Sequence, residues 1–518
     1  MNLRGVVAAS EPNTAEAGAR LLREGGNAID AIVAAKLAAT VVELPLTSLG
    51  GGGACLWGHP ERGFRVLDFF STVPGIGIQK PTSLDFHPVT VDFGPTRQTY
   101  HVGKGAAAIP GELDGLIALH EAGGRLPLSA VVAPAVGLAR HGFGVSPQIS
   151  MILGMLAPIA RVSAAVQKVF LPGDAVPQPG ARLSNPPLAD FLEALGAGHA
   201  AALQGQAREL LIAGFGPEQG GMISAADVAA WRPEVREPLA VPIGDYLVLT
   251  NPPPSAGGGL IGAGLRIASE LGLGREPYLS RQYVEAVAAV LAAVSDLRGA
   301  GYDDLLRTDP ERIRALVGGP GPIGPFVDLA REVRAERTLG GTTHVSVLDA
   351  EGNAASMTTS NGEGCGHALP GLGIHVNNFL GEEDINPHGF HASPPGQRMS
   401  TMMAPTIVLR GGRPIAVLGT GGSNRIRSAI LQTLLGHLVY GQPLERAVAA
   451  PRLHVEGRQL WFEDADLGPG AADSLLKGWP GAARFDQRSM FFGGVHCVGQ
   501  RGDVLYGAAD ARRGGVVA

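Results

Sequence analysis

The sequence predicts a large protein of mixed secondary structure, in which β-sheets are covered by α-helices. Of its 518 residues 45% are hydrophobic, so the chain can bury a sizeable core. Short β-type runs alternate only loosely with helical segments, which argues against a regular βα barrel. No repeat of solenoid period occurs along the chain. We therefore expect two to four units of ~100–200 residues or one large body.

Composition narrows the class of protein further. The chain has 76 Gly and 39 Pro without a collagen-like period, and its mean hydropathy is positive, +0.15, which argues against disorder. The net charge is −6 and the isoelectric point is near 6.2. Without a basic patch, a nucleic acid is not expected as a partner.

Cysteine usage and apolar runs bear on the compartment. Cys55, Cys365 and Cys497 are odd in number and form no CxxC pattern, so we expect packing residues in a reducing compartment rather than disulfides or a zinc site. The N-terminus has only a brief apolar stretch, too short for a signal peptide. The longest apolar run, Ala286–Val294, is about half of a membrane span. A soluble, cytoplasmic protein without a membrane partner is predicted.

Two helices are expected near the N-terminus. Asn13–Glu24 begins with a capping residue, is rich in Ala, Leu, Arg and Glu, and ends at a glycine pair. A second helix runs from Asn27 to about Val42; apolar residues surround it almost completely, so it should lie buried between layers. Further helices are expected at 112–122, 128–141, 281–298 and 425–440.

The expected strands are short. They are Gly5–Ala9, Ala54–Trp57, Leu247–Thr250, His344–Leu348, Ala354–Thr358 and Thr406–Leu409. A hairpin is predicted around Ala350–Asn353. A breaker cluster at Gly318–Pro325, followed by the charged segment Asp328–Arg337, indicates a boundary before Thr342.

Thr342 has a chemical use if the chain is cut before it. The freed α-amine has a reference pKa of about 7.7–8.0, so a modest downward shift makes it a base for the hydroxyl of the same residue. Gly341, on the acyl side, leaves room for an N-to-O shift. The other interpretation is a β-branched strand start without chemistry.

A glycine-rich segment, Gly419–Arg425, precedes the helix expected at 425–440. Backbone N–H groups at a helix start can stabilise an oxyanion, although an ordinary loop would have the same pattern. The chain contains no Walker motif and no HExxH, and Gly50–Gly53 does not match GxGxxG. His388 and His391 are interpreted as a solvated turn, so neither a metal nor a cofactor is expected.

Several segments together resemble the γ-glutamyltranspeptidase family across nearly the whole chain. They include ASEPNTAEAGARLLREGGNAIDAIVAA, SLGGGG, NPPPSAGGG, GTTHVSVLDAEGNA, GTGGSNRI and LYGAADARR. The resemblance implies an α+β fold, the four-layer αββα sandwich of N-terminal-nucleophile hydrolases. It also implies self-cleavage between Gly341 and Thr342 into a large fragment, 1–341, and a small one, 342–518, which form one interleaved body.

The resemblance also assigns roles to residues. Thr342 falls on the nucleophile, Ser360 on a hydroxyl residue that tunes it, and Gly421 and Gly422 on the oxyanion pair. Asn361 lies near the position of an asparagine that contacts substrate.

The substrate side departs from the family pattern. Phe70 stands where the family has an arginine that grips an α-carboxylate, and a phenyl ring supplies no such hydrogen bonds. Glu382 stands in for an aspartate that receives the α-amine, and Thr401 and Met402 replace a serine pair. The loop from Glu382 to Met399 is short, so a full lid is not expected.

We therefore predict a self-processing amidohydrolase that forms an acyl-enzyme on Thr342 from a small amide other than glutathione. The alternative is a γ-glutamyltransferase or glutathione hydrolase in which Arg398, Arg425 or Arg427 replaces the missing guanidinium. An unprocessed, noncatalytic binding protein is the alternative of another class. The expected assembly is a heterodimer of the two fragments, with further oligomerisation left open.

Overall fold

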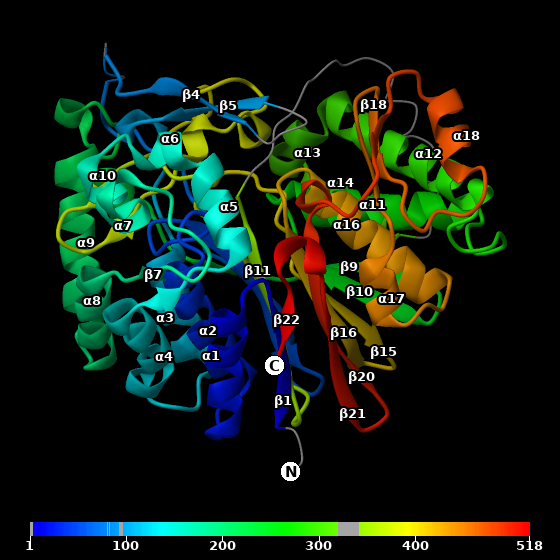
Figure 1. Ribbon diagram of the computed structural model, residues 1–518, viewed down its shortest axis with the longest axis horizontal. Helices are drawn as coiled ribbons and strands as arrows, with labels where there is room; N and C mark the ends of the chain where they lie inside the picture. Colours follow the sequence, from blue (N-terminus) through cyan, green and yellow to red (C-terminus); the bar gives the residue numbers. More distant parts are fainter. Residues whose placement is uncertain (1–3, 80, 82, 93–96, 320–340) are drawn as a thin grey trace.

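Two stacked β-sheets form the centre of the molecule, and helices cover the outer face of each (Figure 1). The computed structural model describes residues 4–79, 81, 83–92, 97–319 and 341–518. The expected α+β class and the four-layer αββα sandwich are confirmed. Among the described residues, no helix is both long and apolar enough to cross a membrane.

The first sheet has seven strands, each antiparallel to its neighbours. In spatial order they are β22 (Val516–Val517), β1 (Gly5–Ala9), β11 (Thr343–Asp349), β12 (Ala354–Ser360), β2 (Gly52–His59), β3 (Gly63–Asp68) and β8 (Glu234–Arg236). The predicted hairpin joins β11 to β12, and β11 also pairs with β1. Strands from before and after Thr342 therefore pair with one another in one sheet.

The second sheet has six strands, again all antiparallel. Their order is β21 (Val504–Ala509), β20 (Gly494–Arg501), β16 (Arg413–Gly421), β15 (Thr406–Arg410), β10 (Tyr246–Thr250) and β9 (Leu239–Ile243). Small sheets decorate the body: β4 (His87–Asp92) with β5 (Arg97–Val102), β6 (Phe143–Gly144) with β7 (Arg182–Leu183), β13 (Ala368–Leu369) with β14 (Ile374–His375), and β17 (Leu453–Glu456), β18 (Gln459–Glu463) and β19 (Ala483–Phe485).

Alternation along the strands separates the apolar layers. On β1, Val6 and Ala8 belong to the cluster between the two sheets, whereas Val7 and Ala9 belong to the cluster under the helices. Successive side chains of a strand point to opposite faces, so one strand contributes to both cores.

Helices of the N-terminal part cover the first sheet. They are α1 (Pro12–Arg23), α2 (Ala28–Val42), α3 (Glu112–Gly123), α4 (Leu128–His141), α5 (Pro147–Met155), α6 (Ala157–Ala160), α7 (Ala164–Phe170), α8 (Pro186–Gly196), α9 (Ala200–Phe215) and α10 (Ala225–Ala230). All residues of α2 are buried, as its apolar circumference predicts, because it lies between the sheet and helices α1, α3 and α4.

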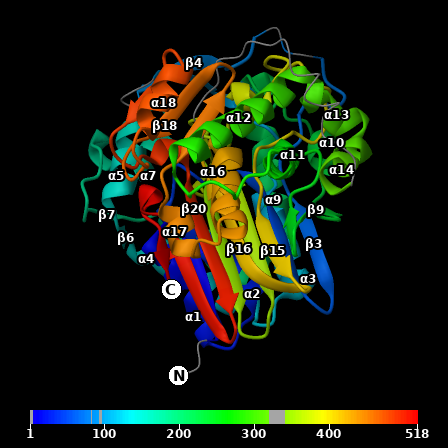
Figure 2. The ribbon, with the colours of Figure 1, turned by 90° about the vertical axis from the view of Figure 1, so that its right-hand side faces the viewer.

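The remaining helices cover the second sheet, as Figure 2 shows from the side. They are α11 (Ala256–Glu270), α12 (Arg281–Leu297), α13 (Asp303–Thr308), α14 (Pro310–Gly318), α16 (Arg425–Leu434), α17 (Leu444–Ala449) and α18 (Ala471–Gly478). The helix expected at 425–440 is regular only to Leu434 and continues as a wider π-type turn, Leu435–Val439.

The other predicted helices and strands are confirmed within a few residues at each end. The boundary segment lies almost entirely outside the described residues. All three cysteines are free and fully buried, as expected of packing residues, and burial raises the pKa of each thiol.

Candidate active site

Thr342 lies directly before β11, near the middle of the first sheet, and only 5% of its surface is exposed. It borders two separate cavities. We call them the Phe70 cavity and the Ser10 cavity, after one lining residue of each. The residue predicted as the nucleophile is therefore in contact with internal space on two sides.

Hydrogen bonds hold the peptide before Thr342 at both of its polar groups. The Ser360 hydroxyl donates to the carbonyl oxygen of Gly341, and the Gly341 N–H donates to Oε1 of Glu363 at 2.7 Å. The Gly362 N–H donates in turn to the Ser360 hydroxyl at 2.9 Å, which orients it. A Cβ at residue 341 would lie 2.5 Å from the Gly362 carbonyl oxygen, so this approach requires glycine.

Glu363 is buried next to this peptide, and its pKa is raised to about 8. Burial is the main cause, and the negative charge of Asp384 adds to it, while the hydrogen bond from Gly341 opposes it. At neutral pH the Glu363 carboxyl group is therefore mostly protonated.

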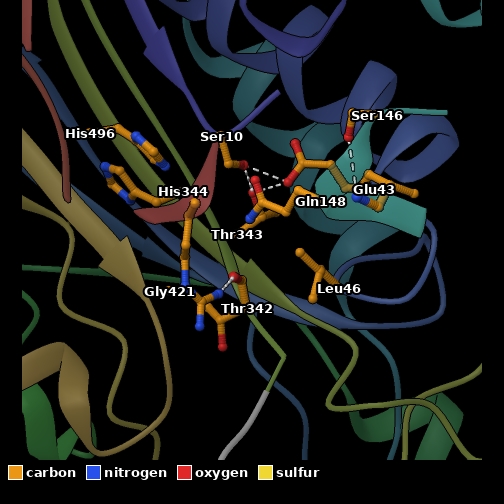
Figure 3. A pocket seen from close by; sticks show the side chains of 12 residues that line it. Ser10, Glu43, Leu46, Ser146, Gln148, Thr342, Thr343, His344, Gly421 and His496 are labelled. Carbon is orange, nitrogen blue, oxygen red and sulfur yellow. Dashed lines mark hydrogen bonds between the residues drawn. The ribbon is translucent and has the colours of Figure 1, made fainter. Parts of the chain in front are cut away.

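In the Ser10 cavity, the Glu43 carboxylate anchors the start of β11 (Figure 3). Glu43 follows α2 and accepts hydrogen bonds from the hydroxyls of Ser10 at 2.5 Å, Thr343 at 2.6 Å and Thr14 at 2.8 Å. Lys36, also on α2 and fully buried, lies 3.5 Å from the Thr343 carbonyl oxygen. These contacts fix the backbone immediately after Thr342.

The glycine-rich segment meets Thr342 from the opposite sheet. A Cβ on Gly421 would lie 2.0 Å from the Thr342 carbonyl oxygen, so only glycine permits this approach. Arg513 donates to the same oxygen at 3.2 Å. Gly422 follows with φ +126°, in a region that favours glycine.

This segment differs from the expected helix start. Gly419 and Gly421 end strand β16, and α16 begins only at Arg425. The buried ring of His344 packs against β16, where a Cβ on Gly419 would lie 2.3 Å from its Cε1 atom. Glycine in this segment therefore serves close packing of the two sheets as well as the turn.

The Phe70 cavity encloses about 380 Å³ of space, part of it open to solvent. Its lining residues are Phe70, Thr342, Ser360, Phe379, Glu382, Asp384, Ile385, Thr401, Met402, Met403, Ser423, Asn424 and Ile426. Five residues predicted from the sequence, besides Thr342, are thus brought together here. Asn361 is not among them: its side-chain nitrogen lies 3.4 Å from Nδ1 of His375.

One side of the Phe70 cavity is apolar. The rings of Phe70 and Phe379 pack with centroids 4.7 Å apart, and Met399 and Met403 belong to the same buried cluster. This surface can contact a hydrocarbon or aromatic group but offers no hydrogen bond to a carboxylate.

The other side carries two buried acidic residues. Asp384 accepts hydrogen bonds from the Ser423 hydroxyl and from the Asn424 amide, the latter at 3.1 Å. Burial, aided by the charges of Glu363 and Asp384, raises the pKa of Glu382 well above its usual value. Burial thus favours the protonated, neutral form of Glu382.

Asp384, Ser423 and Asn424 were not singled out by sequence reasoning. Asp384 lies two residues beyond Glu382, and Ser423 and Asn424 follow the glycine pair directly. The sequence signal was therefore their adjacency to predicted site residues, but only the fold shows which neighbours face the cavity.

Three arginines were considered as substitutes for the guanidinium missing at position 70: Arg398, Arg425 and Arg427. None of them lines the Phe70 cavity. Arg398 donates to the backbone carbonyl oxygen of Phe70. Arg427 is buried and donates to Glu456 at 2.6 Å.

Known proteins resemble this chain over most of its length. The family model described as Gamma-glutamyltranspeptidase matches residues 14–518. The chain is 32% identical to the Acylase ACY 1 proenzyme of Pseudomonas sp. (strain SE83), covering 91% of this chain and 86% of that protein. It is 29% identical to the Glutathione hydrolase 5 proenzyme of Mus musculus, covering 99% and 92%.

Solved structures show the same fold. The crystal structure of cephalosporin acylase from Bacillus halodurans superposes with a TM-score of 0.81 at 22% identity, covering 100% of this chain and 96% of that one. The match of the family model over residues 14–518, together with the 32% identity to the Acylase ACY 1 proenzyme, identifies the chain as a member of the γ-glutamyltranspeptidase family.

Proposed function

We propose that the chain cuts itself between Gly341 and Thr342 and then works as an amidohydrolase with Thr342 as its nucleophile. The observation that carries this proposal is the placement of Thr342. It borders the Phe70 cavity, and the preceding carbonyl group already accepts a hydrogen bond from Ser360.

In self-cleavage, the Thr342 hydroxyl oxygen attacks the Gly341 carbonyl carbon. Negative charge develops on the Gly341 oxygen, where the Ser360 hydroxyl donates. The C–N bond then breaks and the nitrogen takes the proton, leaving an ester between Gly341 and the Thr342 oxygen. Water hydrolyses this ester, which releases the Gly341 carboxylate and regenerates the Thr342 hydroxyl beside the α-amine already freed.

In turnover, the α-amine takes the proton of the Thr342 hydroxyl, whose oxygen attacks the substrate amide carbon. Backbone N–H groups at Gly421 and Gly422 are the proposed donors to the oxyanion. The leaving amine takes the proton and departs, and an acyl-enzyme ester remains. Water attacks this ester, and the α-amine accepts the proton of the water and passes it to the departing Thr342 oxygen. The carboxylic acid is released and the free enzyme is restored.

The lining of the Phe70 cavity favours an acyl group without an α-carboxylate. Phe70 and Phe379 line it in place of a guanidinium, and burial favours the neutral form of Glu382. A γ-glutamyl donor would bury its carboxylate without a charged partner, which is costly. We therefore propose a small amide with an apolar acyl group, in line with the relative named an acylase.

Two assays test the proposal. On a denaturing gel the purified wild type is expected as two fragments, 1–341 and 342–518; a single band of 53.3 kDa would favour the noncatalytic binding protein. Purified enzyme is then given a γ-glutamyl anilide and an aliphatic acyl anilide with the same leaving group. Higher kcat/KM on the aliphatic anilide is expected, and comparable turnover of both would support the γ-glutamyl alternative.

A further inference from the structure

Another cavity shares no lining residue with either of the two cavities at Thr342. It encloses about 530 Å³ of space, part of it open to solvent, between α3, α9, the end of α10 and the β13–β14 hairpin. We call it the Trp231 cavity. Most of its wall is apolar and buried, including Trp231 at 4%, Leu211 at 3% and Ile374 at 2% exposed.

The polar groups of the Trp231 cavity are collected in one place. Asp114 accepts hydrogen bonds from the amide of Gln204 and from Arg208, the latter at 2.9 Å, so the carboxylate and the guanidinium balance each other. Gln204 is a half-buried residue of the cavity wall, and among the described residues nothing donates to its side-chain oxygen. A hydroxyl group of a ligand can donate to this oxygen.

These features define the chemistry of an occupant. The apolar wall is partly open to solvent, so an apolar group that displaces water from it gains free energy in proportion to the apolar surface removed from water. A charged ligand would find no unbalanced charge here. We propose that the Trp231 cavity is a second binding site, for a small neutral molecule with an aromatic group and one hydroxyl.

The wall of this site contacts the residues that shape the Phe70 cavity. The Trp231 indole N–H donates to the carbonyl oxygen of Phe70 at 3.2 Å, and the Phe70 ring lines the other cavity. Leu49 and Gly50 also line the Trp231 cavity and lead into Gly51, where a Cβ would lie 2.2 Å from the Ser360 carbonyl oxygen. An occupant that moves Trp231 therefore shifts Phe70, and substrate binding with it.

Binding is tested without turnover, so this part does not depend on the proposed function. The full chain carrying Thr342→Ala is titrated with 4-fluorobenzyl alcohol and followed by ¹⁹F NMR. Saturable binding is expected, and 4-fluorotoluene, which lacks the hydroxyl, is expected to bind about tenfold more weakly. Absence of saturable binding, or equal affinity for both probes, would overturn the proposal.

A matched pair of variants on α9 locates the site. Ala207 lines the Trp231 cavity, whereas Ala202 on the same helix is exposed. In the Thr342→Ala background, Ala207→Phe fills the cavity and is expected to weaken binding at least tenfold, while Ala202→Phe leaves it unchanged. If Ala207→Phe binds the probe as tightly as its parent, the site lies elsewhere and the proposal fails.

The effect on Phe70 rests on the proposed function and is measured on the processed wild type. Saturating 4-fluorobenzyl alcohol is expected to change KM for the aliphatic anilide at least twofold. Trp231→Phe, which lacks the N–H donor, should still bind the probe by NMR but lose this change. Binding with an unchanged KM in the wild type would refute the coupling to Phe70.

Discussion

The Ser360 hydroxyl donates a hydrogen bond to the carbonyl oxygen of Gly341, the residue immediately before Thr342. In the uncut chain this donor therefore lies where negative charge develops if Thr342 attacks its own backbone. The Gly362 N–H keeps the Ser360 oxygen in place, and Glu363 holds the Gly341 N–H. The candidate scissile peptide is thus bound at both polar groups before any cleavage.

Removing the Ser360 hydroxyl is expected to slow self-cleavage. Loss of one oxyanion donor typically lowers the rate by a factor of about 10²–10³. The uncut chain should therefore accumulate in Ser360→Ala. Ser360→Thr keeps a hydroxyl and should still be cut. A time course on denaturing gels measures the rate. Ser356→Ala, on the same strand but bonded to Leu418, is the control for general loss of strand stability and should cleave at the wild-type rate. Equal rates for Ser360→Ala and wild type would rule out this role.

Thr342 itself is tested by two substitutions. Thr342→Ala should leave a single 53.3 kDa chain, whereas Thr342→Ser retains a hydroxyl and should still be cut. N-terminal sequencing identifies the cleavage site, and the smaller fragment is expected to begin at residue 342. Continued cleavage of Thr342→Ala would show that the nucleophile assignment is wrong.

Gly421 should not tolerate a side chain. Gly421→Ala places a Cβ about where the Thr342 carbonyl oxygen lies, so β11 and β16 must separate and the nucleophile moves. We expect loss of self-cleavage and of anilide turnover by more than tenfold. Gly478→Ala is the matched control, because no atom lies within 4 Å of the added Cβ. Normal processing of Gly421→Ala would contradict the close contact.

Phe70 is expected to select the acyl group. Phe70→Arg introduces a guanidinium into the cavity that Glu382 and Asp384 also line. This guanidinium can pair with a substrate carboxylate. The ratio of kcat/KM for the γ-glutamyl anilide to that for the aliphatic anilide should rise at least tenfold. Phe70→Leu, which keeps the wall apolar, should leave the ratio near that of the wild type. An unchanged ratio in Phe70→Arg, confirmed as folded, would mean that this wall does not contact the acyl group.

Glu363 should make stability depend on pH. Its pKa is raised from 4.5 to about 8 in the folded protein, chiefly by burial, so the folded state binds the proton more tightly than the unfolded state. The free energy of unfolding contributed by this group is therefore greatest below pH 4.5 and falls as pH rises to about 8, by at most about 1.4 kcal/mol per pH unit.

Urea unfolding of Thr342→Ala at pH 5, 6, 7 and 8 measures this slope, and adding Glu363→Gln should flatten it. Glu351→Gln is the control. Arg125 lowers the pKa of that exposed carboxyl, so its contribution to the free energy of unfolding changes with pH only below pH 4.5, outside the measured range. The same slope with and without Glu363→Gln would refute the assignment.

Local patterns were sufficient to predict most elements. The capping residues and glycine stop around α1, the apolar circumference of α2 and the turn between β11 and β12 act over a few residues, so they are readable from sequence. The extent of the helix after Asn424 was less predictable, since packing around it decides where the regular turns end.

The sequence by itself determined the family, the candidate nucleophile and the loss of an arginine at Phe70. Only the tertiary structure decided that Glu43 accepts a hydrogen bond from Thr343 and that Asp384 joins Glu382 in the Phe70 cavity. It also decided that Arg398 donates to the backbone carbonyl oxygen of Phe70. The physical reason is that such contacts join residues as far as 328 positions apart, and their geometry depends on how two sheets stack. A residue type shows what a side chain can do, and the packed layers determine what it faces.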